Sequence, residues 1–110
     1  MLTKAVILGA VAGLLSGPAS AADDAATLDA LMAIEGDVEW GEYLSGECTA
    51  CHAASGGRIP PLSGLPREYM LSALHDYKIG YRENATMQNV AEALGDEELA
   101  ALAAYFESVE

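Results

Sequence analysis

Hydrophobic residues from position 27 onward recur every three or four residues, which is the period of amphipathic α-helices. The first predicted helix covers residues 27–35, with Thr27 as its N-cap and Gly36 at its end. The side that it would bury carries Leu28, Leu31 and Met32. A second helix begins near Asp37, a good N-cap residue, and runs towards Gly46. Because no segment alternates with the two-residue period of a strand, the chain is predicted to be all-α.

Three further helices are predicted in the second half of the chain. One runs from Pro66, an allowed first-turn position, to the residue before Gly80, which stops it. A short helix spans 87–94, and the last has Asp96 as its cap and acids in its first turn, where they suit the helix dipole. Glycines and prolines dominate residues 56–66 and predict a loop. The apolar stripes of the three helices are Met70, Leu71, Leu74 and Tyr77; Met87, Val90, Ala91 and Leu94; and Leu99, Leu102, Ala103 and Phe106.

The first 22 residues have the features of a secretory signal peptide. Lys4 precedes an apolar run over residues 5–15, and small residues at 19–21 supply a cleavage site. The alternative is a retained membrane anchor, but the run is shorter than the roughly 20 residues that span a bilayer. The predicted organisation is therefore a cleaved signal peptide (1–22), an N-terminal extension (23–36) and one domain (37–110). The product is expected to be periplasmic and soluble, without stable membrane insertion after cleavage.

The chain is strongly acidic, with 17 Asp and Glu against five Lys and Arg and a net charge of −12. Such a surface repels nucleic acid and anionic membranes, so no nucleic-acid partner is expected. The charge either favours a basic docking patch on a protein partner or only keeps an exported protein soluble. A domain this small usually needs a staple beyond its hydrophobic core, and the chain has one Trp and one Phe.

The two cysteines of the chain form the motif Cys48-Thr49-Ala50-Cys51-His52. Cys-x-x-Cys-His is the attachment signature of c-type haem: two thiols on one helical turn add to the haem vinyl groups, and the histidine binds iron. Two other readings are a redox-active Cys-x-x-Cys, which normally accompanies a βαβ pattern, and a structural zinc site, for which His75 is the one plausible fourth ligand. Neither explains why the histidine follows the second cysteine directly.

The sixth iron position has several candidate ligands, namely Met32, Met70, Met87 and His75. Met70 lies on the apolar face of a helix, where methionine usually fills the core, and Met32 precedes the motif in a segment that could be peripheral. Met87 follows a loop at the start of a helix and is the predicted ligand. An open sixth position would instead indicate a haem enzyme or sensor.

The order of these features resembles the class I cytochrome c family over about residues 37–108. The segments that carry the resemblance include Ile59-Pro60-Pro61-Leu62-Ser63-Gly64, Lys78-Ile79-Gly80-Tyr81-Arg82, Thr86-Met87-Gln88 and residues 96–106. It implies four to five short helices around one haem c per chain. It further implies that the Pro60 carbonyl accepts a hydrogen bond from His52, that Arg82 lies near a haem propionate, and that Gly41 packs against Tyr105 or Phe106.

The resemblance extends to the halves of two-haem bacterial cytochromes and to the haem subunit of flavocytochrome c sulfide dehydrogenase. It implies an electron-transfer protein that is not itself an enzyme, acting with protein redox partners. One version is the haem subunit of a sulfide dehydrogenase-type complex with a flavoprotein partner, and the alternative is a free diffusible carrier. Trp40 and the stripe of Leu28, Leu31 and Met32 either contact a partner subunit or cover the domain itself.

Overall fold

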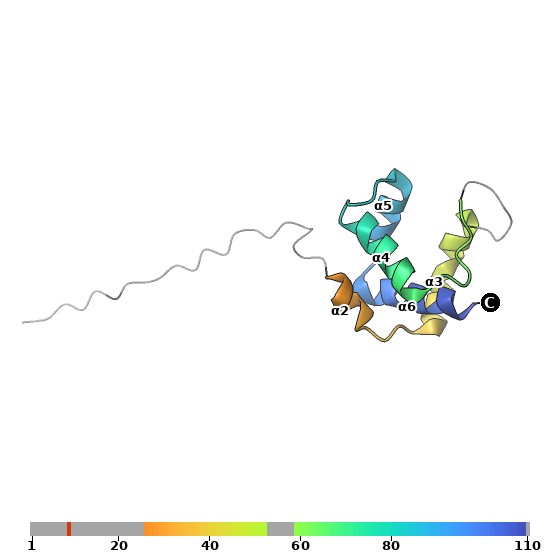
Figure 1. Cartoon of the computed structure of the whole chain (residues 1–110), viewed down its shortest axis with the longest axis horizontal. Helices are drawn as coiled ribbons and strands as arrows, with labels where there is room; N and C mark the ends of the chain where they lie inside the picture. The colour runs from red at the N-terminus through yellow and green to blue at the C-terminus, as the bar shows by residue number, and fades with distance from the viewer. Residues whose placement is uncertain (1–8, 10–25, 53–58, 110) are drawn as a thin grey trace, which may run out of the picture.

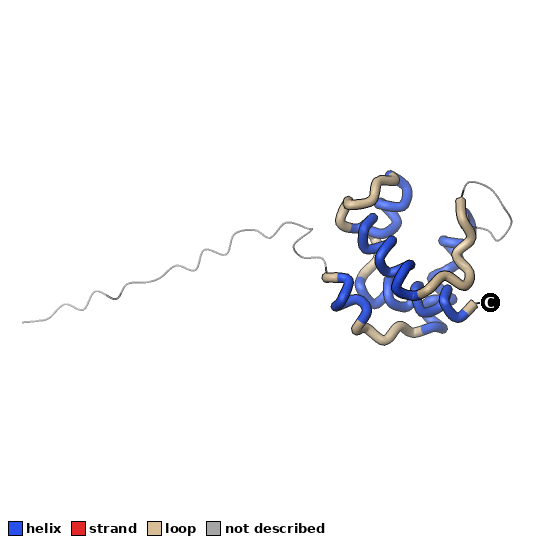
Figure 2. Tube along the Cα trace, viewed as in Figure 1, coloured by secondary structure: helices blue, strands red, loops and turns tan. Residues whose placement is uncertain are grey.

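The regular structure of the chain consists of α-helices in the part that a computed structural model describes, residues 26–52 and 59–109 with Gly9. The helices are α2 (Leu28–Met32), α3 (Val38–Cys51), α4 (Arg67–Lys78), α5 (Ala85–Glu92) and α6 (Asp96–Ser108) (Figure 1). Figure 2 shows these helices and, in tan, the described loops between them. The predicted all-α class is confirmed. The predicted signal peptide lies outside the described residues, Gly9 apart.

The first two helices begin where their caps predict but end elsewhere. The Thr27 hydroxyl accepts from Ala30 N at 3.2 Å, and the Asp37 carboxylate accepts from Trp40 N at 3.1 Å. α2 stops at Met32, short of Gly36. α3 continues through Gly46 to Cys51, so the prediction that it ends before the cysteine motif is wrong. Glycine in a helix interior costs only about 1 kcal/mol, which packing on a neighbouring helix outweighs.

The last two helices start differently from their predicted positions. α5 begins two residues before 87, because the Asn84 side chain caps it by accepting from Met87 N at 3.0 Å. Gly95, and not Asp96, caps α6, and the Glu98 carboxylate accepts from Gly95 N at 3.0 Å. Asp96 lies inside the first turn, where its charge still suits the helix dipole.

α6 is the base on which the other helices are arranged. α3 packs along it, α4 packs on it at another place, and α5 packs on α4. α3 contacts neither α4 nor α5, and Figure 1 shows α3 on one side of the fold with α4 and α5 on the other. The fold therefore has two arms, α3 on one side and α4 with α5 on the other. Both arms pack on α6, and they do not contact each other.

A glycine allows α3 and α6 to cross at close range. A Cβ atom on Gly41 would lie 2.1 Å from the Ala101 carbonyl oxygen and 2.7 Å from the Tyr105 Cβ. The predicted pairing of Gly41 with Tyr105 is thus confirmed. Gly36 makes a second approach of the same kind, since its Cβ would lie 2.2 Å from the Ala100 carbonyl oxygen.

The N-terminal extension packs onto the domain. Leu31 is 1% exposed within the main core cluster, and Leu28 and Met32 pack against that cluster. The Arg67 guanidinium donates to the carbonyl oxygens of Met32 at 3.0 Å and Ile34 at 2.6 Å. The stripe of α2 therefore covers the protein's own core, and the alternative in which Leu31 contacts a partner subunit is wrong.

Among the described helices, none combines the length and the apolar composition needed to cross a membrane.

Candidate haem site

The two arms enclose a cavity of about 1200 Å³. α3 contributes both cysteines and His52 follows it directly, while α4 and α5 contribute Met70 and Met87. The remaining wall is mostly aliphatic and includes Leu44, Leu62, Leu65, Leu74, Leu94 and Leu102. A small-molecule pocket usually measures about 300–1,000 Å³. The size, the apolar wall and the thiol, imidazole and thioether donors together fit a haem.

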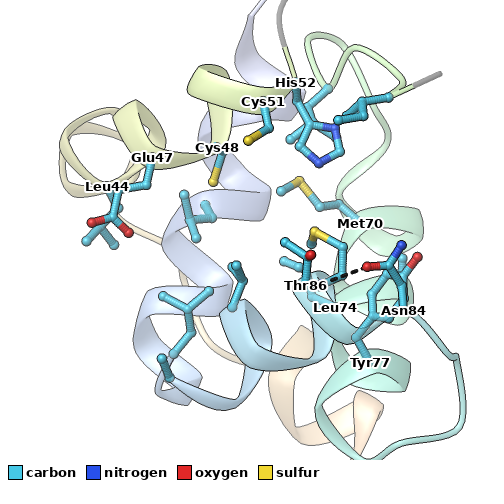
Figure 3. Close-up of a pocket in the computed structure, with 18 of the residues that line it drawn as sticks. Leu44, Glu47, Cys48, Cys51, His52, Met70, Leu74, Tyr77, Asn84 and Thr86 are labelled. Carbon is cyan, nitrogen blue, oxygen red and sulfur yellow. Dashed lines mark hydrogen bonds between the residues drawn. The ribbon is translucent and has the colours of Figure 1, made fainter. Parts of the chain in front are cut away.

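Two cysteine side chains lie at the end of α3 that borders the cavity. Figure 3 shows the sulfur atoms of Cys48 and Cys51 directed into the space beside His52. The thiols are not joined in a disulfide, and Cys48 is the less exposed of the two. Burial raises the pKa of the Cys48 thiol, and the neighbouring Glu47 carboxylate raises it further. Before attachment, the Cys48 thiol therefore holds its proton more firmly than a free cysteine does.

His52 is oriented by a backbone carbonyl across the 53–58 segment. Its Nδ1 lies 2.7 Å from the Pro60 carbonyl oxygen. A carbonyl only accepts, so this hydrogen bond requires the tautomer that carries its proton on Nδ1. The Nε2 lone pair then remains available to a metal, and the bond fixes the orientation of the ring.

Two methionines line the same cavity from different helices. Met70 is 4% exposed and belongs to the main core cluster, together with Leu71 and Leu74. Figure 3 shows its side chain reaching towards the His52 side of the cavity. Met87 is half-buried in the first turn of α5, where the Asn84 cap holds its backbone. The sequence names Met70 as a candidate ligand but favours a role in the core, and in the structure Met70 belongs to both the core cluster and the cavity wall.

The other candidate ligands lie away from the cavity. His75 Nε2 is 2.9 Å from the Ala26 carbonyl oxygen, and neither His75 nor Met32 lines the cavity. Within the described residues, no three His, Cys, Asp or Glu side chains converge on a metal-binding position. Arg82 does line the cavity, but its Cζ lies 5.1 Å from the Tyr77 ring centroid, as in a cation–π contact.

A comparison with protein families identifies the chain. The profile of the Cytochrome c family matches residues 38–110, which is most of the sequence and includes every helix from α3 to α6. The chain belongs to the cytochrome c family. The all-helical fold of this cytochrome is that of class I, and its cofactor is one covalently bound haem c.

Several curated proteins are similar to this cytochrome. Cytochrome c4 of Pseudomonas aeruginosa is 36% identical over 85 residues, covering 74% of this chain and 42% of its own. Cytochrome c-554(548) of Halomonas halodenitrificans is 37% identical over 82 residues, covering 68% of this chain and 99% of its own. The cytochrome subunit of sulfide dehydrogenase of Chlorobaculum tepidum is 38% identical over 69 residues, covering 60% and 63%. The chain thus spans less than half of the first relative and nearly all of the second.

Asn84 is the site residue that sequence reasoning missed in this cytochrome. It was expected in the loop before the helix, whereas its side chain caps α5 and fixes the backbone of Met87. The signal was present, because asparagine is among the preferred N-cap residues. The Gln88 side chain also accepts from Asn84 N at 3.3 Å.

Proposed function

We propose that this protein is a periplasmic electron carrier whose haem is attached through Cys48 and Cys51 and bound at iron by His52 and Met87. When bound, the haem supplies one-electron chemistry, with its iron alternating between Fe(II) and Fe(III). The observation that carries the proposal is that two thiols, an imidazole and a methionine thioether line one apolar cavity. Two protein ligands leave no coordination position for a substrate, so the chain itself performs no substrate chemistry.

The choice of Met87 over Met70 rests on how each side chain is held. Met70 is 4% exposed and packs among core leucines of α4, so moving its sulfur would disturb that packing. Met87 lies in the first turn of a separate helix, α5, which contacts α4 but not α3. A thioether on α5 can therefore approach iron from the arm opposite His52. Methionine ligation also raises the reduction potential, which suits a carrier.

The remaining residues exclude water and orient the ligands. The leucines of the cavity wall keep the surroundings of the iron apolar, which limits solvent access and influences the potential. Pro60 holds the His52 ring through its carbonyl oxygen, 2.7 Å from Nδ1. We assign Arg82 to a haem propionate as part of the same proposal, because it lines the cavity and carries a positive charge.

The protein acts with a redox partner, either as a haem subunit of a dehydrogenase or as a free carrier. The likeness to a cytochrome subunit of sulfide dehydrogenase supports the dehydrogenase version, for which we propose a flavoprotein partner. The match to cytochrome c-554(548) covers 99% of that protein, so a cytochrome can consist of one domain of this size, as the free-carrier version requires. A native mass measured in extracts of the producing organism separates the two, since a monomeric mass contradicts the subunit version.

The ligand set is tested by spectroscopy of the oxidised holoprotein. Methionine ligation produces a weak sulfur-to-iron charge-transfer band at the red end of the visible spectrum. We expect Met87→Ala to lose this band and to lower the reduction potential, while haem stays with the denatured polypeptide through Cys48 and Cys51. Met70→Leu is the matched control, because it removes the other cavity thioether. It leaves Met87 in place and should therefore keep the band. A band that survives in Met87→Ala and disappears in Met70→Leu overturns the assignment.

A further inference from the structure

The outer side of α3 carries an exposed aromatic stripe beside the haem cavity. Trp40, Tyr43 and Glu47 follow one another at i, i+3 and i+7, so they are neighbours on the helix surface. We call these three residues the α3 stripe. It continues into the cavity wall, because Tyr43 and Glu47 line the cavity, and Figure 3 shows Glu47 beside Leu44 on the α3 wall. Cys51 lies one further turn along the same face.

The aromatic side chains of the stripe are exposed although the helix beneath them is fixed. Trp40 is 40% exposed and Tyr43 is 83% exposed. Trp40 is not part of the cavity wall, so its exposure does not depend on the cofactor. Gly41 and Ser45 bury the opposite face of α3 against α6, and the Asp37 cap bonds Trp40 N. The helix therefore presents Trp40 outward in a fixed position, which is how interface anchors are presented.

The charge around the stripe is of one sign. α3 contains no basic residue, and Glu39, Glu42 and Glu47 are all exposed on it. Of the basic side chains in the described residues, Arg67 donates to backbone carbonyls, Lys78 donates to the Leu94 carbonyl and Arg82 lies over Tyr77. Each cation is thus engaged within the protein, away from α3. Within the described residues, the aromatic side chains of the stripe are therefore bordered by carboxylates and by no basic side chain of α3.

We propose that the α3 stripe docks a basic protein surface that has an apolar centre, and that this surface belongs to the redox partner. The proposal rests on the electron-transfer function proposed above and adds the place and the chemistry of the partner. Opposite charges steer the encounter of the two proteins. Trp40 and Tyr43 are then covered by the partner and stabilise the complex. A second copy of this chain does not fit, because its net charge of −12 and its own acidic α3 repel the stripe. The stripe also lies on the helix that bears the haem-attachment cysteines, so docking brings the partner near the cofactor.

The experiment uses the reduced, haem-loaded full chain with two helical peptides of equal charge. One peptide has lysines around a row of leucines, and its partner has serines in place of the leucines. NMR titration reports the site directly, since the chain has a single Trp and hence one indole N–H resonance. We expect the leucine peptide to shift that resonance and the amides of 39–47, and to bind more tightly than the serine peptide. Shifts centred on α5 or α6 overturn the proposal.

Matched variants separate the apolar contribution from the charge. Trp40→Ala should weaken binding of the leucine peptide about tenfold and leave binding of the serine peptide nearly unchanged. Glu47→Lys should weaken binding of both peptides. Glu92→Lys makes the same charge change at an exposed residue of α5 and should weaken binding much less. Equal effects of Glu47→Lys and Glu92→Lys would show that only net charge matters and would refute the docking site.

The result is independent of the iron ligands. Peptide binding is measured on the reduced protein, and the sulfur-to-iron band is measured on the same preparation after oxidation. A normal band without shifts in the α3 stripe contradicts the docking proposal alone. Shifts in the stripe without the band contradict the Met87 ligation alone.

Discussion

The residues proposed as iron ligands are each positioned by one hydrogen bond from a neighbouring loop. His52 Nδ1 meets the Pro60 carbonyl at 2.7 Å, and Met87 N donates to the Asn84 side chain at 3.0 Å. Both partners are polar groups close in sequence to the residue that they position. Orientation is thus set locally on each arm, while the distance between the arms depends on the packing of helices.

The Asn84 cap has a measurable effect on the thioether. Asn84→Ala should cost about 0.5–2 kcal/mol of unfolding free energy, because the first turn of α5 loses its side-chain acceptor. Since the lost bond joins Met87 N, the sulfur-to-iron band should also vanish at lower denaturant concentration than global unfolding. Asn84→Asp retains the acceptor. It should restore both the unfolding free energy and the denaturant concentration at which the band vanishes. Equal midpoints for the band and for global unfolding in Asn84→Ala would contradict this role.

Arg82 and Tyr77 should be energetically coupled. Their cation–π contact, with 5.1 Å between Cζ and the ring centroid, lies near the surface, where such pairs contribute about 0.5–1 kcal/mol. A double-mutant cycle with Arg82→Gln and Tyr77→Leu measures that coupling by urea unfolding. The contact uses the face of the guanidinium and leaves its N–H groups able to donate to a propionate. A coupling energy near zero would contradict the cation–π contact.

Sequence reasoning at this scale succeeded where chemistry depends on spacing and failed where it depends on tertiary contact. The Cys-x-x-Cys-His run predicts a haem without any structure, and the family match bears out the cofactor. The role of Arg67 was not predictable. Its hydrogen bonds reach carbonyls 33 and 35 positions away, and no local pattern marks an arginine for such a partner.

At the scale of elements, the crossing of α3 and α6 depends on small residues. Gly41 in α3 and Gly36 in the loop before it approach the backbone at Ala101 and Ala100 so closely that no side chain fits at either position. The resemblance to class I cytochromes c predicted the contact of Gly41. Gly36 was expected only to end a helix, because its packing role comes from a segment 64 positions later in the chain.

Two glycines of α3 form a matched pair for testing this crossing. Gly41→Ala should destabilise the protein by at least about 1–3 kcal/mol, since its Cβ would overlap the Ala101 carbonyl. Gly46→Ala places the same methyl group where nothing lies within 4 Å and should stabilise the helix by about 0.5–1 kcal/mol. Thermal unfolding of both holoproteins gives the comparison. Similar changes in the two variants would be incompatible with close helix packing at Gly41.

The short helix α2 should contribute to the core through one residue. Leu31→Ala removes a side chain that is 1% exposed and should cost about 2–5 kcal/mol. Val38→Ala, at a side chain 42% exposed, should cost much less. Urea unfolding of the two variants tests whether the N-terminal extension is part of the cooperative fold. A cost below that of Val38→Ala would show that α2 unfolds separately.

Helix types were predictable because the apolar spacing is local, whereas helix ends were less so. α3 passes through Gly46, and α5 starts two residues early at Ala85. Both differences arise from competition between propensity and context. Packing on α6 sustains α3, and the cap at Asn84 advances the start of α5.

Self-repulsion is the dominant electrostatic feature of the whole molecule. The net charge is −12, and within residues 26–52 and 59–109 no Lys or Arg side chain forms a salt bridge with a carboxylate. An excess of like charge destabilises a compact state, and salt screens it. Moderate sodium chloride should therefore raise the melting temperature of the holoprotein. A melting temperature that falls on adding salt would mean that attractive pairs dominate.

The close contact of α3 with α6 has a consequence for the order of assembly. The backbone atoms that meet at Gly36 and Gly41 lie outside the cavity, so this contact needs no atom of the cofactor. We expect these two helices to associate early and to offer Cys48 and Cys51 on a preformed helical turn. α4 and α5 then have to pack only onto this preformed pair of helices. Maturation would proceed from a preassembled half, with the last step being the arrival of Met87.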